Sequence, residues 1–440
     1  MGGCYLRVEK AVAATLIMLA LIFYSSVLFL WNGYDIDIFV NWVVAAKELG
    51  ITSLYKAPEV FGERFRVVYP PLAPLIFVSN YMLAEYFAAK LVGVDNADAI
   101  YLVALALALV KLSLIGLSIY IGYVIYRRRG LVYAAVWLAG IPVLTVVFMY
   151  QFDLYAAALL YAALLLYEAN RCRLATLLYT LSILVKPLTI LVAPILALYM
   201  VQRYGLKASF KLALMSMFVS LAVVIPFILG GSGPKPLSKW TIEFHLERQP
   251  QGPTIATLYY QLVSRDLLMP TICLVALLLL TYYSFYKRLR RGGAGVEDVY
   301  RYSLLVFMVY MMLGKVVNPQ YYVFPYILAV EIAVPHLIVL MNLAAFFIDA
   351  YFIYDFIAGL KIGSVYMPDE QRWYNVNLLV HLSSAPHTRE SVEYLLNSPA
   401  AQMLADVFAR YYHEFGYLFS IAHILVLLAA SYVVVRRARA

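Results

Sequence analysis

Repeated long apolar runs are the feature that most restricts how this chain can fold. A helix needs about 20 apolar residues to cross the hydrocarbon core of a bilayer, and several runs approach or exceed that length. Only 13% of the 440 residues are charged, whereas soluble domains average about 25%. The 64% hydrophobic share also excludes a disordered chain, because disorder combines low hydrophobicity with high charge. The sequence therefore predicts an all-α polytopic membrane protein.

The apolar runs predict about twelve transmembrane helices. They are expected at 11–31, 98–126, 131–150, 152–169, 174–185, 187–201, 211–229, 267–286, 299–317, 320–334, 336–357 and 416–435. The first run is too long for a signal-peptide core of about 7 to 15 residues, so we expect it to remain as a membrane anchor. The fifth and sixth runs are too short for two full crossings. They predict a V-shaped hairpin whose apex, Lys186-Pro187, lies partly within the membrane.

Basic residues occupy nearly every second gap between these spans. They are Arg7 and Lys10; Arg127, Arg128 and Arg129; Arg171 and Arg173; Arg203 and Lys207; Lys287, Arg288, Arg290 and Arg291; and Arg436, Arg437 and Arg439. The positive-inside rule places these gaps and both termini in the cytoplasm. The net charge of +9 thus indicates topology, and no nucleic-acid partner is expected.

This topology puts the longer polar segments, 32–97, 230–266 and 358–415, on the extracytoplasmic face, where we expect the chemistry. We expect a membrane catalytic domain over 1–357 that includes the outer loop 32–97. An outer loop or cap over 358–415 follows, and a last helix with a basic cytoplasmic tail covers 416–440. His381, His387 and His413 lie within the cap at spacings that fit no metal site.

Two carboxylates, Asp35 and Asp37, follow the first span directly. A helix N-cap explains one of them, but ionisable groups at the edge of a bilayer favour a functional role for the pair. Apolar residues from Phe39 to Ala46 recur at helical spacing, which predicts a helix in the membrane interface. A second amphipathic stretch is expected at 72–92, after the bend at Tyr69-Pro70-Pro71.

Five short motifs carry a family resemblance. They are Asp35-Ile36-Asp37, Val68-Tyr69-Pro70-Pro71, Leu184-Val185-Lys186-Pro187, Phe244-His245-Leu246-Glu247-Arg248 and Asn318-Pro319-Gln320-Tyr321-Tyr322-Val323. In order and topological side, the set resembles the GT-C glycosyltransferases that use polyprenyl-phosphate sugars, and most of all the GPI mannosyltransferase I (PIG-M-type) family. The resemblance implies a GT-C-like fold. It also implies transfer of a hexose, expected to be mannose, from a polyprenyl (dolichyl) phosphate to an extracytoplasmic lipid or glycan acceptor.

A lipid phosphate is a good leaving group, so one general base can suffice for this transfer. The resemblance assigns that role to Asp35, with inversion at the anomeric carbon, and Asp37 would orient the acceptor. The residues by themselves do not rank the two carboxylates. The Asp-x-Asp pattern of soluble nucleotide-sugar enzymes holds a metal against a diphosphate. Because lysine and arginine can neutralise a monophosphate, neither a metal nor another cofactor is expected here.

The leaving phosphate needs positive charge directed at it from a low-dielectric cleft. Lys186, His245, Arg248 and Lys315 are the candidates on the outer side. Lys315 could equally snorkel near a helix end, and the two loop residues could form a solvated face. The resemblance adds Gln320 and Tyr321 to this donor-phosphate group.

Gln151 and Asp153 lie at a predicted outer turn, where they could contact sugar hydroxyls or make structural hydrogen bonds. Tyr69 is placed with them as an acceptor or sugar contact. The expected partners are the polyprenyl-phosphate sugar, the acceptor, the membrane, expected to be a cell membrane, and a small membrane subunit. Two rival functions remain: a transporter or flippase of lipid-linked saccharides, with ionisable groups along both halves of a path, and a non-catalytic subunit sharing the fold.

Overall fold

The computed structural model describes residues 2–28, 33–92, 99–292, 294–362 and 398–439, and within these ranges the chain is helical and has no strand. The N-terminal part forms α1 (Gly2–Ser26), α2 (Gly33–Leu49), η1 (Ile51–Lys56), α3 (Ala57–Phe61), η2 (Glu63–Phe65) and α4 (Leu72–Val92). The middle part forms α5 (Ala99–Arg129), α6 (Leu131–Ala139), α7 (Ile141–Met149), α8 (Asp153–Glu168), α9 (Cys172–Val185), η3 (Pro187–Val192), α10 (Ala193–Tyr204) and α11 (Leu206–Leu229). The C-terminal part forms α12 (Pro234–Ser238), η4 (Lys239–Glu243), α13 (Phe244–Glu247), α14 (Ile255–Leu262), α15 (Leu268–Arg290), α16 (Val296–Leu313), η5 (Pro319–Tyr322), α17 (Val323–Ile332), α18 (Pro335–Ile362), α21 (Pro399–Arg410) and α22 (Tyr412–Arg439).

Eight helices in the described ranges are long and apolar enough to cross a membrane, or nine spans if the bent pair α6 and α7 counts as one. These helices indicate a membrane-embedded protein. The predicted count of twelve is not confirmed. Helices α8, α9 and α17 have only 16, 14 and 10 residues. Protein surrounds much of α8 and all of α17, so their lengths need not match the thickness of a bilayer.

The stretch 72–92 corrects a second expectation. It forms α4, which is not amphipathic and is one of the eight candidate spans. Its one acidic residue, Glu85, forms an ion pair of 2.7 Å with Lys47 of α2. The polar residues that interrupt the apolar run therefore do not build a polar face, and the segment predicted to be an outer loop contains a helix of transmembrane character.

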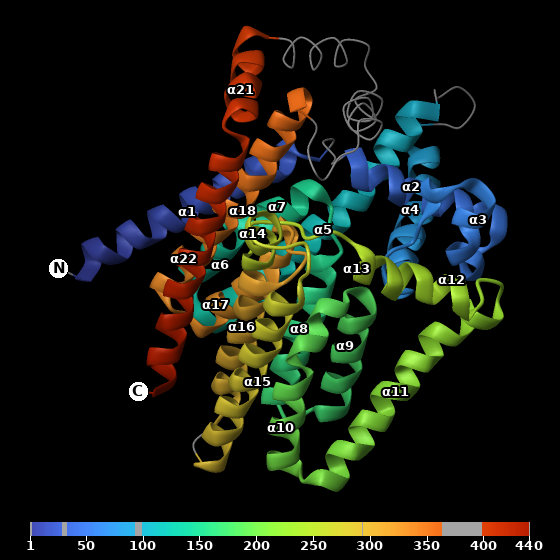
Figure 1. Ribbon diagram of the computed structural model, residues 1–440. Helices are drawn as coiled ribbons and strands as arrows, with labels where there is room; N and C mark the ends of the chain where they lie inside the picture. The colour runs from blue at the N-terminus through green and yellow to red at the C-terminus, as the bar shows by residue number, and fades with distance from the viewer. Residues whose placement is uncertain (1, 29–32, 93–98, 293, 363–397, 440) are drawn as a thin grey trace.

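Protein burial separates central from peripheral helices. All ten residues of α17 are buried, and α16 is buried along most of its length. In contrast, α11 buries only Phe227, and its remaining apolar surface suits contact with lipid. In Figure 1 the connections α10–α11 and α15–α16 lie at the lower edge, whereas α2, α3, α4 and α21 lie in the upper half. These two basic connections therefore lie at the opposite end from α2, α3, α4 and α21.

The predicted helix break at Lys186 is present, but the second arm, Pro187–Tyr204, is one of the eight candidate spans and is therefore not too short to cross a membrane. Helix α9 ends at Val185, and Lys186 is extended (φ −142°, ψ 113°) before the 3-10 helix η3. Pro187 explains this geometry, because its ring disfavours helical conformation at the preceding residue. The chain then folds back, since Tyr179 Oη donates a hydrogen bond of 2.9 Å to the carbonyl of Thr189.

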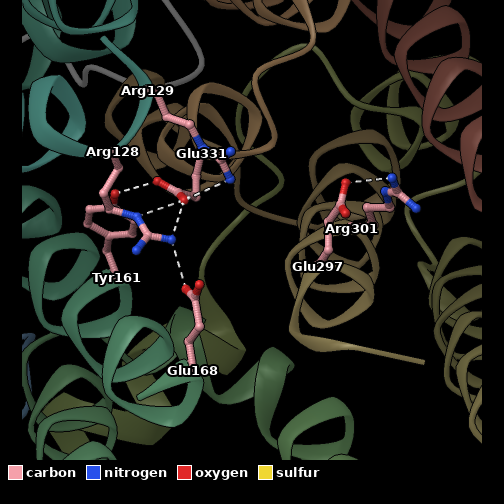
Figure 2. Close-up of polar contacts among 7 residues, drawn as sticks. All are labelled: Arg128, Arg129, Tyr161, Glu168, Glu297, Arg301 and Glu331. Carbon is pink, nitrogen blue, oxygen red and sulfur yellow. Dashed lines mark hydrogen bonds and ion pairs between the residues drawn. The ribbon is translucent and has the colours of Figure 1, made fainter. Parts of the chain in front are cut away.

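A charged cluster joins α5, α8 and α17 (Figure 2). Glu331 is fully buried and accepts hydrogen bonds of 2.9 to 3.0 Å from Arg128 and Arg129. Tyr161 Oη donates a further bond of 2.5 Å to the same carboxylate, and Glu168 pairs with Arg128 at 2.8 Å. The basic gap 127–129 therefore also fixes three helices to one another.

The described part of the predicted cap is helical. Helix α21 and the start of α22 pack along α18 (Figure 1), and Tyr412 Oη donates to Asp355 Oδ1 at 2.5 Å. His381 and His387 lie outside the described residues. His413 is an exposed residue of α22.

Candidate functional site

Asp35 lies in the first turn of α2, against the turn that joins α7 to α8. Its Oδ2 accepts a hydrogen bond of 2.6 Å from Gln151 Nε2. Burial raises the pKa of Asp35 to about 6. The hydrogen bond from Gln151 and the charges of Lys186 and Arg248 act in the opposite direction and favour the ionised carboxylate. Asp35 is thus a positioned carboxylate that titrates close to neutral pH.

Asp37 follows two residues later in α2, and the placement of its side chain lies outside the described residues. Its role in orienting the acceptor stays a prediction. Of the two carboxylates that the sequence leaves unranked, Asp35 is directed at the α7–α8 turn through its bond to Gln151.

A buried ion pair forms the centre of the site. Lys186 Nζ lies 3.0 Å from Asp153 Oδ2, and the two side chains are 8% and 0% exposed. The ammonium group also lies 4.8 Å from the ring centre of Tyr69 and 4.9 Å from that of Tyr321. Removing charges from water is costly unless they are paired, and aromatic faces add favourable contact for a cation. The hairpin apex therefore places a lysine in a mostly enclosed, weakly screened position.

The α7–α8 turn is shaped by its flanking aromatic residues. Tyr150 adopts a left-handed conformation (φ 50°) and ends α7, and Phe152 stacks on Trp42 of α2 with ring centres 5.9 Å apart. Phe39 packs against Phe152 at 4.9 Å. These contacts dock the start of α2 on the turn, which brings Asp35 to Gln151. The same rings lower the local dielectric and so strengthen the charge interactions.

The segment after α12 brings His245 and Arg248 to the site. His245 Nε2 is hydrogen-bonded to the carbonyl of Val68 at 2.8 Å, next to Tyr69. Burial lowers the pKa of His245, and the charges of Arg248 and Lys186 lower it further. His245 is therefore neutral at pH 7 and donates its Nε2–H to Val68. Arg248 is half-buried, and its charge acts on both Asp35 and Lys186.

Lys315 anchors the segment that carries His245 and Arg248. Its Nζ donates a hydrogen bond of 2.6 Å to the carbonyl of Leu246. The backbone of Gln251 pairs with the segment 315–317, donating to the Lys315 carbonyl at 2.8 Å and accepting from the Val317 amide at 2.9 Å. Arg248 therefore sits in a short arch that is anchored at both ends. A phosphate contact by Lys315 stays a prediction.

Gln320 and Tyr321 both lie in η5 and are buried. The Tyr321 ring faces Lys186, and Gln320 Oε1 is buried without a hydrogen-bond partner. The next residue, Tyr322, is hydrogen-bonded to His423 Nε2, and His423 Nδ1 bonds to the carbonyl of Pro253 at 2.7 Å. Sequence reasoning missed His423 because it lies inside an apolar span, where a lone histidine gave no signal beyond its polarity.

Other charged groups within the helices have structural partners. Lys111 Nζ donates at 2.9 Å to the carbonyls of Val27 and Phe148, close to the C-terminal ends of α1 and α7. Asp349 Oδ2 accepts a bond of 2.8 Å from Thr145. Glu331 is engaged by arginines. The partners found for Lys111, Asp349 and Glu331 in the described part of the chain are thus other residues and not one another.

Most of the predicted site residues converge. Direct contacts link Asp35 with Gln151, and link Lys186 with each of Asp153, Tyr69 and Tyr321. The charge of Arg248 acts on both Asp35 and Lys186. Among the described residues, no group of three or more His, Cys, Asp or Glu side chains is placed to hold a metal ion. Comparison with protein families and with curated proteins finds no match to this chain.

Proposed function

We propose that this protein is an integral membrane glycosyltransferase that moves a hexose, mannose by resemblance, from a polyprenyl phosphate to a lipid or glycan acceptor. One observation carries the proposal: a carboxylate with a pKa of about 6 lies beside a buried Asp153–Lys186 pair and within electrostatic reach of Arg248. This combination offers a base and a cationic group in one enclosed place. The motifs that supply it lie far apart in the sequence.

In the proposed reaction Asp35 is the general base. Its carboxylate takes the proton of the acceptor hydroxyl while the hydroxyl oxygen bonds to the anomeric carbon. The bond from that carbon to the phosphate oxygen breaks on the opposite face, so the centre inverts. A pKa of about 6 suits this task. At pH 7 Asp35 is ionised in most protein molecules, yet its carboxylate is more basic than that of an ordinary aspartate.

The leaving lipid phosphate keeps the electron pair of the broken bond and gains negative charge. Lys186 and Arg248 supply the compensating charge, which is most effective in a weakly solvated site. His245, Lys315, Gln320 and Tyr321 complete the donor side in this proposal, while Asp37, Tyr69, Gln151 and Asp153 face the acceptor and sugar. The lipid phosphate sugar is a substrate, and no separate cofactor is invoked.

The proposal places the site on the extracytoplasmic face of a cell membrane, with both termini in the cytoplasm. Exposed Ile242 and Leu246, one helical turn apart near the site, suit an interfacial position in which a lipid-linked substrate enters from the bilayer. A small membrane subunit remains a candidate partner.

The principal alternative is a transporter or flippase of lipid-linked saccharides. A transport path needs ionisable groups that face it on both halves of the membrane. Tyr161 lies about two turns of α8 from Asp153, at roughly 1.5 Å per residue, and there the charged groups close on one another around Glu331. Because these charges pair with one another and join helices, they do not line a transport path. The remaining candidate groups lie on one side, which favours the enzyme over the transporter.

The decisive experiment compares Asp35→Asn with wild-type protein in transfer from a synthetic polyprenyl-phosphate mannose. Loss of the base should lower kcat/KM by about 10²- to 10⁴-fold, with the protein still folded by its melting temperature. Asp266→Asn makes the same change at an exposed outer-loop carboxylate and should retain activity. Near-normal turnover in folded Asp35→Asn would refute the base assignment.

A further inference from the structure

Three oxygen atoms in the site are buried without hydrogen-bond partners. In the part of the chain that the structure describes, four side-chain carbonyl or carboxylate oxygens have this property, on Gln151, Asp153, Asp298 and Gln320. Three of the four therefore belong to the candidate site. A buried acceptor without a donor is destabilising, and native proteins keep few of them without a reason.

These oxygens belong to Asp153 itself and to two residues close in sequence to Asp153 and Tyr321. Gln151 and Asp153 are both 0% exposed and lie two residues apart at the start of α8. Gln151 donates its Nε2–H to Asp35, and Asp153 accepts a hydrogen bond from Lys186 at Oδ2, so Gln151 Oε1 and Asp153 Oδ1 are left without partners. Gln320 precedes Tyr321, whose ring contacts the same lysine.

The chemistry of these atoms separates them from the cations nearby. An ionised phosphate offers only acceptors and cannot satisfy an amide or carboxylate oxygen, whereas a hydroxyl group can donate to it. Lys186 and Arg248 therefore suit the phosphate, and the three oxygens suit a neighbouring group that carries several hydroxyls.

We infer that Gln151, Asp153 and Gln320 form a hydroxyl-reading subsite for the transferred sugar ring. This inference rests on the proposed function and narrows its substrate class to glycosyl groups whose ring hydroxyls are free, as opposed to deoxygenated or esterified. A donor that lacks a hydroxyl at a position read by one of these residues leaves the buried oxygen unsatisfied.

Gln151 also connects recognition to the base. Its amide is planar, so a hydroxyl bound at Oε1 fixes the direction of Nε2, which holds Asp35 Oδ2 at 2.6 Å. Gln151 is thus a positioning residue: binding of the correct ring orients the carboxylate that accepts the proton. Loss of the hydroxyl should therefore reduce kcat as well as raise KM.

The test uses lipid-phosphate sugars that each lack one ring hydroxyl, assayed with the full-length wild type and with Gln151→Met and Gln320→Met. The wild type should lose about 10- to 100-fold in kcat/KM for at least one deoxy donor. Gln151→Met removes both the Oε1 acceptor and the Nε2 donor to Asp35 at similar size, so transfer from every donor should slow. Its penalty for one deoxy position, measured against its own rate with the full donor, should nevertheless fall to about twofold or less while other penalties remain. Gln320→Met should relax a different position. Gln202→Met, far from the site on α10 where Gln202 bonds to Leu289, should keep the wild-type pattern.

Equal transfer of every deoxy donor by the wild type would overturn the subsite while leaving the glycosyltransferase intact. The subsite is overturned in the same way if both methionine variants keep every wild-type penalty. Absence of transfer from the fully hydroxylated donor would instead overturn the proposed function, and the inference with it. If one methionine variant is unfolded by its melting temperature, the other decides between these outcomes.

Discussion

At the scale of single residues, Asp35 shows how position changes the chemistry of an ordinary side chain. An aspartate in water has a pKa near 4 and is a weak base. Burial at the start of α2 raises that pKa to about 6, and Gln151, Lys186 and Arg248 prevent a larger rise. The carboxylate is therefore basic enough to take a proton and is still mostly ionised at neutral pH.

The pH dependence of transfer should report this residue. Protonated Asp35 cannot accept a proton, so kcat/KM should rise with pH through a midpoint near 6 and then level off. Arg248→Gln removes a charge that favours ionised Asp35, so it should move the midpoint upward. Rate profiles between pH 4.5 and 8 would measure both, and a midpoint near 4 would contradict the buried setting of Asp35.

At the scale of elements, the site depends on segments that hold one another in register. The α7–α8 turn, the α9–η3 apex, η5 and the arch around Arg248 each supply one or two groups. The arch follows the segment 315–317 closely enough that an added Cβ at Gly252 would lie 2.1 Å from the Val317 carbonyl oxygen. Backbone contact of this kind leaves no room for a side chain.

Substitution at Gly252 should therefore disturb the arch and lower activity. Gly252→Ala meets both the clash and a positive φ of 88°, and the displaced loop moves Arg248 away from Lys186. We expect at least a tenfold loss of kcat/KM, in line with the cost of small misplacements in active sites. Gly292→Ala is the matched control, because Gly292 has φ 75° and nothing within 4 Å. Similar activity in the two variants would show that the arch does not need this register.

The Glu331 cluster makes a separate prediction about stability. Glu331→Gln leaves Arg128 and Arg129 facing a neutral group in a buried position, so unfolding should become easier by about 3 kcal/mol. Glu297→Gln breaks the ion pair of an exposed glutamate with Arg301 (Figure 2) and should cost less than about 0.5 kcal/mol. Thermal unfolding in detergent measures both. Folded Glu331→Gln should keep its transfer activity, and a selective loss of activity would place the cluster in the reaction.

At the scale of the whole molecule, two basic connections share one end of the helical assembly. The basic connections α10–α11 and α15–α16 lie at one end in Figure 1, and helices α2, α3 and α4 lie toward the other end. The positive-inside rule predicts that the end with these two connections faces the cytoplasm. Because α4 has transmembrane character, the number of apolar runs does not by itself fix which end of the protein faces the cytoplasm.

Labelling of single cysteines would measure the orientation. In a chain with Cys4, Cys172 and Cys273 replaced by serine, Lys235→Cys in α12 should react with a membrane-impermeant maleimide in intact cells. Arg291→Cys, at the end of α15, should react only after permeabilisation. Both positions are exposed, so accessibility to water does not separate them. The reverse pattern would place the candidate site in the cytoplasm.

The sequence by itself determined that the chain is helical and membrane-embedded, that it turns at Lys186-Pro187, and which polar residues stand out from the apolar background. These properties depend on composition and on local backbone chemistry, which a single sequence contains. It did not determine the number of spans, because buried helices such as α17 need not match the bilayer, nor the character of α4. Only the tertiary structure decided that Lys186 pairs with Asp153, that Gln151 holds Asp35, and that Lys315 and His423 hold loops. Such pairings form between segments more than thirty residues apart, and their energies depend on burial and distance, which exist only once the helices have packed.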